Sequence, residues 1–154
     1  MQKIEPHVKN EFLIGLGKIT GNFAYLEAVV SFFVWELVDD QQIGQIVTSQ
    51  LSFDRLLNVL GALYRYRSKC EGKIDELMEL LKEASEAEQN RNKITHSVWG
   101  FNEEGFSRMK FSVNRKKGAR LQYEDIFAED LNRIADEISE VANRIKKFMS
   151  SHKT

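Results

Sequence analysis

The sequence predicts a mainly α-helical fold: an antiparallel bundle of four to five helices with a small β-hairpin inserted before the last helix. Three observations lead to this fold class. The 154 residues include a single proline, and the helix-forming residues Leu, Ile, Glu, Lys and Ala are abundant. Apolar residues recur every three or four positions along most of the chain, which is the period of an amphipathic helix. From Gly100 to Tyr123 the period changes to two, as in a strand.

A chain of 154 residues can form one domain with its own core, so we expect residues 1–154 to be a single domain. The apolar fraction of 42% and the charged fraction of 29% are ordinary for a soluble globular protein. Because the formal net charge is −1, any nucleic-acid site must be a local basic patch. Cys70 is the only cysteine, which excludes an internal disulfide and suits a reducing cytoplasm.

The first predicted helix runs from Pro6 to Val38. Proline is tolerated in a first turn, and no later proline interrupts the pattern. Gly15, Gly17 and Gly21 weaken this helix, so either it bends there or another helix approaches closely.

The second half of this helix, Phe23 to Val38, is apolar on more than one face. Such a helix is typically central or at an interface, which favours a dimer. Glu27 and Glu36 interrupt the apolar run, and it is shorter than the roughly 20 residues that cross a bilayer. We therefore expect a buried helix and no membrane segment.

Two helices follow before residue 72. Asp39 and Asp40 end the first helix and cap a short one at about Gln41 to Val47. Ser52 is the expected N-cap of the next helix, which carries a regular apolar stripe and ends near residues 68–72.

The next helix is predicted from about Lys73 to Trp99, with Gly100 as its stop. One stripe of this helix consists of residues three or four apart: Leu77, Leu80, Leu81, Ala84, Ala87, Arg91, Ile94 and Val98. Arg91 lies in this otherwise apolar stripe. A buried guanidinium needs a carboxylate, a carbonyl or an anionic ligand, and Glu88 is the nearest acidic candidate.

Asn92 and His96 are four residues apart and share the neighbouring face of the same helix. His96 is expected near the last turn, where the helix dipole favours a charged imidazole. This position suits an acid or a base in catalysis.

A β-hairpin is predicted after this helix. Met109, Phe111 and Val113 alternate with polar residues, a second alternating run ends at Tyr123, and residues 114–118 between the runs have turn chemistry. Six cations and no acid lie between residues 105 and 122: Arg108, Lys110, Arg115, Lys116, Lys117 and Arg120. Two interpretations are open, namely solvated lysines that protect a strand edge and a flap that contacts phosphates.

The last helix is expected to begin after Asp125 as its cap. Its apolar residues alternate steps of four and three, as in bundle cores: Phe127, Leu131, Ile134, Ile138, Val141, Ile145 and Phe148. This helix carries no sign of chemistry.

The segment from Arg91 to His96, Arg-Asn-Lys-Ile-Thr-His, resembles the motif of the HEPN superfamily (higher eukaryotes and prokaryotes nucleotide-binding domains). That motif is an arginine, a polar residue, three or more further residues and a histidine. Residues 51–53 and the His-Ser-Val-Trp of residues 96–99 also resemble one bacterial branch of the family. The resemblance covers nearly the whole chain.

The resemblance implies a metal-independent endoribonuclease of toxin–antitoxin or antiphage systems, built as a homodimer whose two motifs form one cleft. Arg91 would hold the scissile phosphate, His96 would transfer protons, and Asn92 would orient either group or the RNA. In the branch paired with a nucleotidyltransferase antitoxin, a tyrosine follows the motif histidine by two residues. Val98 occupies that position here, so regulation by nucleotide transfer is not expected.

Candidate RNA contacts are Lys93, Trp99, Arg115, Lys116 and Lys117. Trp99 either stacks on a base or, the interpretation we favour, is a core aromatic at a helix end.

No Gly-rich phosphate loop, HExxH or CxxC motif or nucleophile elbow occurs in the sequence. His7, His96 and His152 are too scattered for a metal set, so we expect neither metal nor cofactor. The expected partners are RNA, a second copy of the chain and an antitoxin or regulatory protein. The alternative is a noncatalytic HEPN-like dimeric module, with a structural Arg91, that binds a partner protein, a nucleotide or RNA.

Overall fold

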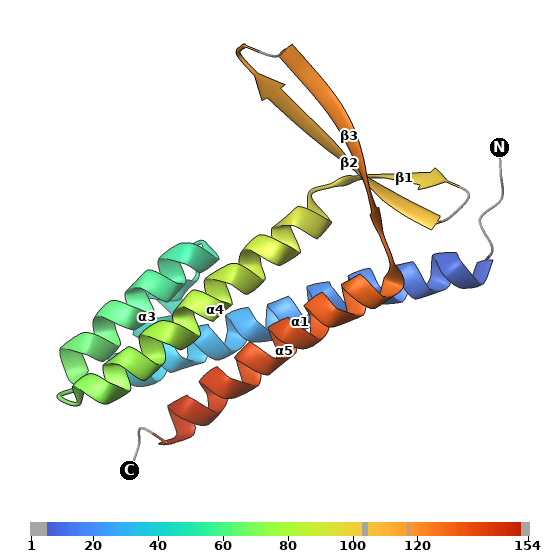
Figure 1. Ribbon diagram of the computed structural model, residues 1–154. Coiled ribbons are helices and arrows are strands. Elements are labelled where there is room, and N and C mark those ends of the chain that lie inside the picture. Colours follow the sequence, from blue (N-terminus) through green and yellow to red (C-terminus); the bar gives the residue numbers. More distant parts are fainter. Residues whose placement is uncertain (1–5, 103–104, 117, 152–154) are drawn as a thin grey trace.

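The computed structural model describes residues 6–102, 105–116 and 118–151, whose arrangement is shown in Figure 1. The elements in chain order are helices α1 (Pro6–Val38), α2 (Gln41–Thr48), α3 (Phe53–Arg67) and α4 (Glu71–Thr95), strands β1 (Val98–Asn102), β2 (Gly105–Asn114) and β3 (Gly118–Ile126), and helix α5 (Ala128–Ser151). The prediction of a mainly helical chain with a small β element before the last helix is confirmed.

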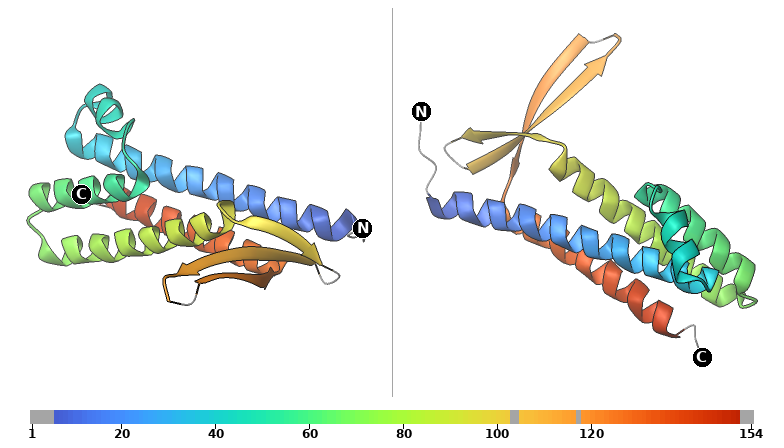
Figure 2. Two further views of the ribbon diagram at one scale, coloured as in Figure 1. Left: turned by 90° about the horizontal axis from the view of Figure 1, so that it is seen from above. Right: turned by 180° about the vertical axis from the view of Figure 1, so that it is seen from behind.

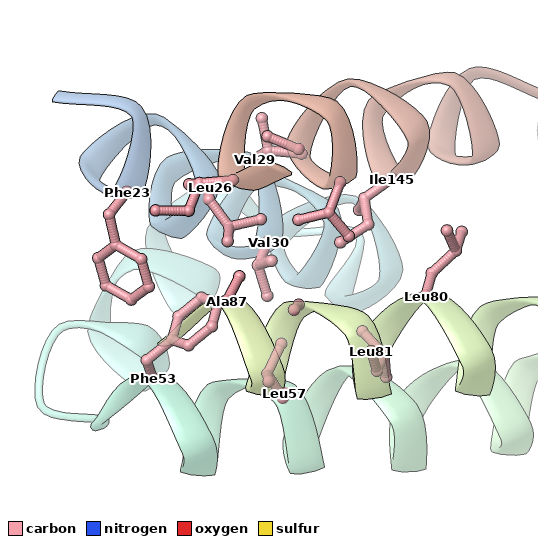
Figure 3. Close-up of a cluster of buried hydrophobic side chains, with 14 of the residues drawn as sticks. Phe23, Leu26, Val29, Val30, Phe53, Leu57, Leu80, Leu81, Ala87 and Ile145 are labelled. Atoms are coloured by element: carbon pink, nitrogen blue, oxygen red, sulfur yellow. The ribbon is translucent and has the colours of Figure 1, made fainter. Parts of the chain in front are cut away.

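Helices α1 and α5 lie side by side along most of their length, and α4 packs against α5 and α3 (Figures 1 and 2). One hydrophobic cluster fills the space between the helices. Within this cluster Phe23 of α1 meets Phe53 of α3 edge to face, with the ring centroids 4.9 Å apart (Figure 3). The apolar stripes of the four long helices therefore converge on one core.

The three strands form one antiparallel sheet in the order β1-β2-β3. Its base packs on α1, where the Phe106 and Phe12 rings are stacked with their centroids 3.7 Å apart. The outer parts of β2 and β3 extend away from the bundle as a two-stranded ribbon (Figures 1 and 2). We call strands β2 and β3, with the turn between them, the arm.

The motif helix ends earlier than predicted. It stops at Thr95, with His96 as its C-cap, while Val98, Trp99 and Gly100 belong to β1. The cause is strand pairing: Val98 faces Met109 across the sheet, and β-branched and aromatic residues fit a pleated surface well. The prediction of a helix to Trp99 with Gly100 as its stop was therefore wrong, and the third strand was missed.

Asp125 does not cap the last helix. It lies in β3 opposite Ser107, and α5 begins at Ala128. Instead, the side chain of Asp130 in the first turn accepts a hydrogen bond from the backbone N–H of Phe127, at 3.2 Å. Phe127 is 55% exposed, so the predicted core stripe begins one turn later, at Leu131.

The other caps largely follow the prediction. Asp40 precedes α2, and its side chain accepts a hydrogen bond from the backbone N–H of Ile43 at 3.0 Å. Ser52 precedes α3 as expected, but its side chain forms no capping hydrogen bond.

Among the described residues, one helix is long and apolar enough to cross a membrane by length and composition, Lys9–Val38, with a mean hydropathy of 1.2. The core helix of a globular protein satisfies the same criteria. This helix supplies Phe23, Leu26, Val30 and Phe33 to the core, each at most 2% exposed.

Gly15 marks the close approach of α1 to α5. A Cβ atom added there would lie 2.7 Å from the Cβ of Leu131. Gly15→Ala should therefore lower the free energy of unfolding by about 1–3 kcal/mol through overpacking, although alanine is the better helix former. Denaturant unfolding measures this. The control is Gly72→Ala on α4, where the added Cβ meets nothing within 4 Å; it should leave stability unchanged or slightly raised.

Candidate functional site

Groups within the helical bundle interact with the positively charged side chain of Arg91. Arg91 is half-buried on α4, and its guanidinium carbon lies 4.1 Å from the centre of the Phe23 ring of α1. One guanidinium nitrogen, Nη1, donates a hydrogen bond to Oδ1 of Asn92 at 2.7 Å. An aromatic face and an amide oxygen thus hold the arginine in an otherwise apolar stripe.

Carboxylates from three helices interact electrostatically at Glu88, three residues before this arginine. Burial raises the pKa of Glu88 on α4 above its ordinary value. The positive charge of Arg91 opposes this shift, the negative charges of Asp54 on α3 and Glu27 on α1 add to it, and a hydrogen bond with Asn92 opposes it. Glu88 and Arg91 therefore attract each other as predicted, but the bundle end of the site is acidic.

The raised pKa of Glu88 makes stability depend on pH. Between the ordinary and the raised pKa the folded chain binds more protons than the unfolded chain, so this group's contribution to stability falls as pH rises through that window. Glu88→Gln should therefore raise the free energy of unfolding at pH 7, by less than about 1 kcal/mol after solvent screening.

This gain should disappear at a pH below the ordinary glutamate pKa, where Glu88 is protonated in both states. Urea unfolding at the two pH values measures the difference. Glu86→Gln, at an exposed glutamate of the same helix, is the control. If Glu88→Gln destabilises the protein at pH 7, the attraction of Arg91 outweighs the burial of Glu88.

Side chains and backbone groups donate hydrogen bonds to the carbonyl oxygens of the last turn of α4. The backbone N–H of His96 donates to the carbonyl oxygen of Asn92 at 3.1 Å, and the Thr95 hydroxyl donates to that of Arg91 at 3.1 Å. The carbonyl oxygen of Lys93 accepts from the hydroxyl of Ser97 and, at 3.1 Å, from the guanidinium of Arg108. The last turn is therefore held in place, and the side chain of His96 is left exposed at its tip.

Arg108 has a structural role that the sequence reading missed. It is one of the six cations for which both a solvated strand edge and a phosphate-contacting flap were open interpretations, but its side chain is only 13% exposed. Its guanidinium forms an ion pair with Glu124 on β3 and also bonds to the end of α4. The hairpin register, which places Arg108 opposite Glu124, could have indicated this pairing.

The structure separates the two ends of the motif. Arg91 and Asn92 are in direct contact on the bundle side, whereas His96 caps the helix. Within the described part of the chain, no hydrogen bond joins the side chain of His96 to either of them. A single chain thus presents a half-buried guanidinium and an exposed imidazole as neighbours on one helix end, without a hydrogen bond between them.

The candidate RNA contacts lie in three places. Lys93 is exposed on α4, with Nζ 3.5 Å from Oδ1 of Asn90. Trp99 is half-buried and packs edge to face on Phe12, with centroids 4.9 Å apart, which supports the interpretation as a core aromatic.

Two of the remaining candidates belong to the turn at the far end of the arm (Figure 1). Arg115 and Lys116 are exposed at the turn. Lys117 lies outside the described residues. The basic turn is thus presented away from the helices rather than packed on the motif.

Among residues 6–102, 105–116 and 118–151, no group of three or more histidine, cysteine, aspartate or glutamate side chains is arranged to hold a metal ion. His152 lies outside the described residues.

The chain matches no family model, no curated protein and no solved structure.

Proposed function

We propose that this chain is a metal-independent endoribonuclease of HEPN type that works as a homodimer in the cytoplasm. The proposal rests on one observation above all: Arg91, Asn92 and the exposed His96 occupy the closed, C-terminal end of the motif helix. The placement of this helix supports it, since α4 is the third of the four long helices in the described chain.

The proposed reaction is attack by the RNA's own 2′-hydroxyl on the adjacent phosphorus. One His96 takes the proton of the 2′-hydroxyl as the bond from the 2′-oxygen to phosphorus forms. The bond from phosphorus to the 5′-oxygen breaks, and the His96 of the second protomer gives that oxygen a proton. The products are a 2′,3′-cyclic phosphate and a 5′-hydroxyl.

Arg91 stabilises the negative charge that builds on the non-bridging oxygens. A guanidinium has five N–H donors, and Asn92 accepts from one nitrogen of this group. Asn92 thereby acts as a positioning residue that fixes the plane of the guanidinium, while other donors face the phosphate.

A free face of α1 supports the homodimer. Gly15, Gly44 and Gly61 each lie against a side chain of their own chain, whereas a Cβ atom added at Gly17 or Gly21 would meet nothing within 4 Å. Gly17 and Gly21 weaken the helix without any contact of their own chain to explain them.

Large apolar side chains flank these two glycines on the same part of α1, namely Leu13 (52% exposed), Ile14 (57%), Tyr25 (40%) and Phe32 (47%). We call this surface, with Gly17 and Gly21, the free face of α1. A second copy of α1 fits it because glycines let two helix backbones approach closely and the apolar side chains leave water.

The proposal is tested by incubating the protein with a labelled mixture of tRNA and mRNA in excess EDTA. Cleavage that leaves 2′,3′-cyclic phosphate and 5′-hydroxyl ends is the expected result. Cleavage by wild type only when Mg²⁺ is added, or 5′-phosphate ends, would contradict the mechanism.

A noncatalytic dimeric module is the second candidate function, and one observation favours it. Arg91 already contacts Phe23 and Asn92, and together with Glu27 and Asp54 it acts electrostatically on Glu88. Such a site resembles a structural ion-pair network more than an empty phosphate pocket. This candidate predicts no cleavage by wild type, together with retained dimerisation and binding of a regulatory protein.

A further inference from the structure

The arm has an apolar face that no part of the described chain covers. Partners across an antiparallel sheet point to the same side, so the register places Val98, Met109 and Tyr123 in one row and Phe111 with Leu121 in the next. Four of these are strongly exposed: Val98 at 62%, Phe111 at 70%, Leu121 at 45% and Tyr123 at 63%. Figure 1 shows the outer part of this sheet standing clear of the helices.

A two-stranded ribbon is at best marginally stable in water, and exposed apolar patches of this kind usually mark a binding surface. The question is which partner fits. The arm carries a net positive charge, since residues 105–126 contain six cations and two acids, Glu124 and Asp125. Arg115 and Lys116 are exposed at its turn, while Lys110 and Arg120 alternate with the rings and lie on the opposite face. Two arms of the same net charge repel each other, which disfavours a second copy of the arm as the occupant.

Aromatic rings on a ribbon of net positive charge favour a different ligand. Phe111 and Tyr123 occupy diagonal positions on the same face, because Phe111 pairs with Leu121, two residues before Tyr123. Single-stranded nucleic acid is bound in this way elsewhere, with bases stacked on aromatic side chains and the backbone held by Lys and Arg. The stacking partner must be unpaired, because a duplex buries its base faces.

The arm is also joined to the motif. Only Ser97 separates His96 from β1, and Arg108 of β2 bonds to the carbonyl oxygen of Lys93 in the last turn of α4. RNA bound along the arm would therefore lead towards the helix end that carries His96.

We propose that the apolar face of the arm is a stacking platform for single-stranded RNA, with Phe111 and Tyr123 each holding one base. This inference rests on the proposed ribonuclease function for its ligand, and it names the surface that binds the substrate on either side of the cut. It assigns a role to two residues that sequence reasoning had treated only as strand-forming.

The test measures binding of a fluorescein-labelled 12-nucleotide single-stranded RNA to full-length protein carrying His96→Ala, which keeps the RNA intact. Adding Phe111→Ala or Tyr123→Ala should raise Kd roughly 5- to 150-fold each, the effect of losing one stacked base. Tyr123→Phe keeps the ring and should leave Kd unchanged.

Two further controls separate stacking from general apolar contact. Leu121→Ala removes apolar surface from the same face without removing a ring, and Tyr66→Ala removes a tyrosine that is 88% exposed on α3, away from the arm. Both should change Kd less than about 3-fold, on the scale of a stacked base. Circular dichroism and sedimentation should show each variant folded and with unchanged mass.

The salt dependence of RNA binding distinguishes base stacking from contact with phosphates. Losing a ring should leave the slope of log Kd against log salt unchanged, whereas Arg115→Gln should reduce it by about 0.7, the value for one phosphate contact on a single strand. Unchanged Kd in both ring variants overturns the platform. The platform is also overturned if Leu121→Ala weakens RNA binding as much as the ring variants do and changes the sedimentation mass of the protein. The face would then be a protein contact.

The platform and the ribonuclease can fail separately. If wild type cleaves RNA but the ring variants bind it normally, the platform is wrong and the catalytic proposal stands. If wild type binds RNA through the two rings but never cleaves it, the platform stands and the catalytic proposal is wrong.

Discussion

His96→Ala should lower the rate of RNA cleavage by about 10²- to 10⁴-fold, the usual contribution of a positioned general acid or base. The variant should preserve the end of α4, because His96 contributes to it only through its backbone N–H, which donates to the carbonyl oxygen of Asn92. Its side chain is exposed, so its removal should change the free energy of unfolding by no more than about 0.5 kcal/mol. Single-turnover cleavage of a labelled RNA in EDTA, alongside denaturant unfolding, measures both quantities.

His152→Ala is the matched control, since it removes a histidine that lies outside the Arg91–His96 motif. It should cleave like wild type. Equal rates for His96→Ala and wild type would remove His96 from the chemistry, whatever else the motif does.

Arg91 needs a different variant because it is also part of the packing. Arg91→Ala removes the contact with Phe23 and leaves Glu88 without its attracting charge, so some destabilisation is expected in addition to lost cleavage. Arg91→Lys keeps the charge but not the planar group that stacks and donates to Asn92. A folded Arg91→Lys variant with impaired cleavage would assign the loss to phosphate geometry rather than to unfolding.

The sequence predicted the helices well because their apolar stripes are long and regular. It failed at the end of α4, where the stripe seemed to continue through Ile94 to Val98, yet Val98 is 62% exposed in β1. Local spacing cannot detect pairing with β2, a segment further along the chain. Asp125 was misplaced for the same reason, since its pairing with Ser107 extends β3 past the expected cap.

The site shows the same limit of local reasoning. The apolar stripe around Arg91 indicated that its charge needs a partner, and Glu88 was correctly identified as an acidic residue that attracts it. The ring of Phe23 and the carboxylates of Glu27 and Asp54 come from other helices, so no spacing within α4 could reveal them. Interhelical groups of this kind decide whether Arg91 is a phosphate ligand or a structural cation.

Gly21→Leu should convert the proposed dimer to a monomer and abolish cleavage, while leaving the fold intact or more stable. A leucine fits the monomer because nothing lies within 4 Å of a Cβ added at this position, and leucine is the better helix former by up to about 1 kcal/mol. It obstructs a dimer because it fills the space that a second α1 would occupy. Sedimentation equilibrium and the EDTA cleavage assay on the same samples measure the two effects.

Gly72→Leu on α4 is the control, since it also meets open space but lies outside the free face of α1. It should stay dimeric and active. A Gly21→Leu protein that remains a dimer would place the interface elsewhere, and one that is monomeric but still cleaves would show that each chain carries a complete site.

Mixed dimers then distinguish a shared cleft from two separate sites. A dimer formed from one His96→Ala chain and one Arg91→Lys chain keeps one intact Arg91 and one intact His96, on different protomers. If the two motifs converge on one phosphate, this mixed dimer should cleave faster than either parent but slower than wild type, because one arginine and one of the two proton-transferring histidines still face the same RNA. No recovery, despite exchange of subunits, would mean that Arg91 and His96 must act from the same chain. In that case the single helix end of α4 would have to bring together groups that no hydrogen bond within the described chain connects.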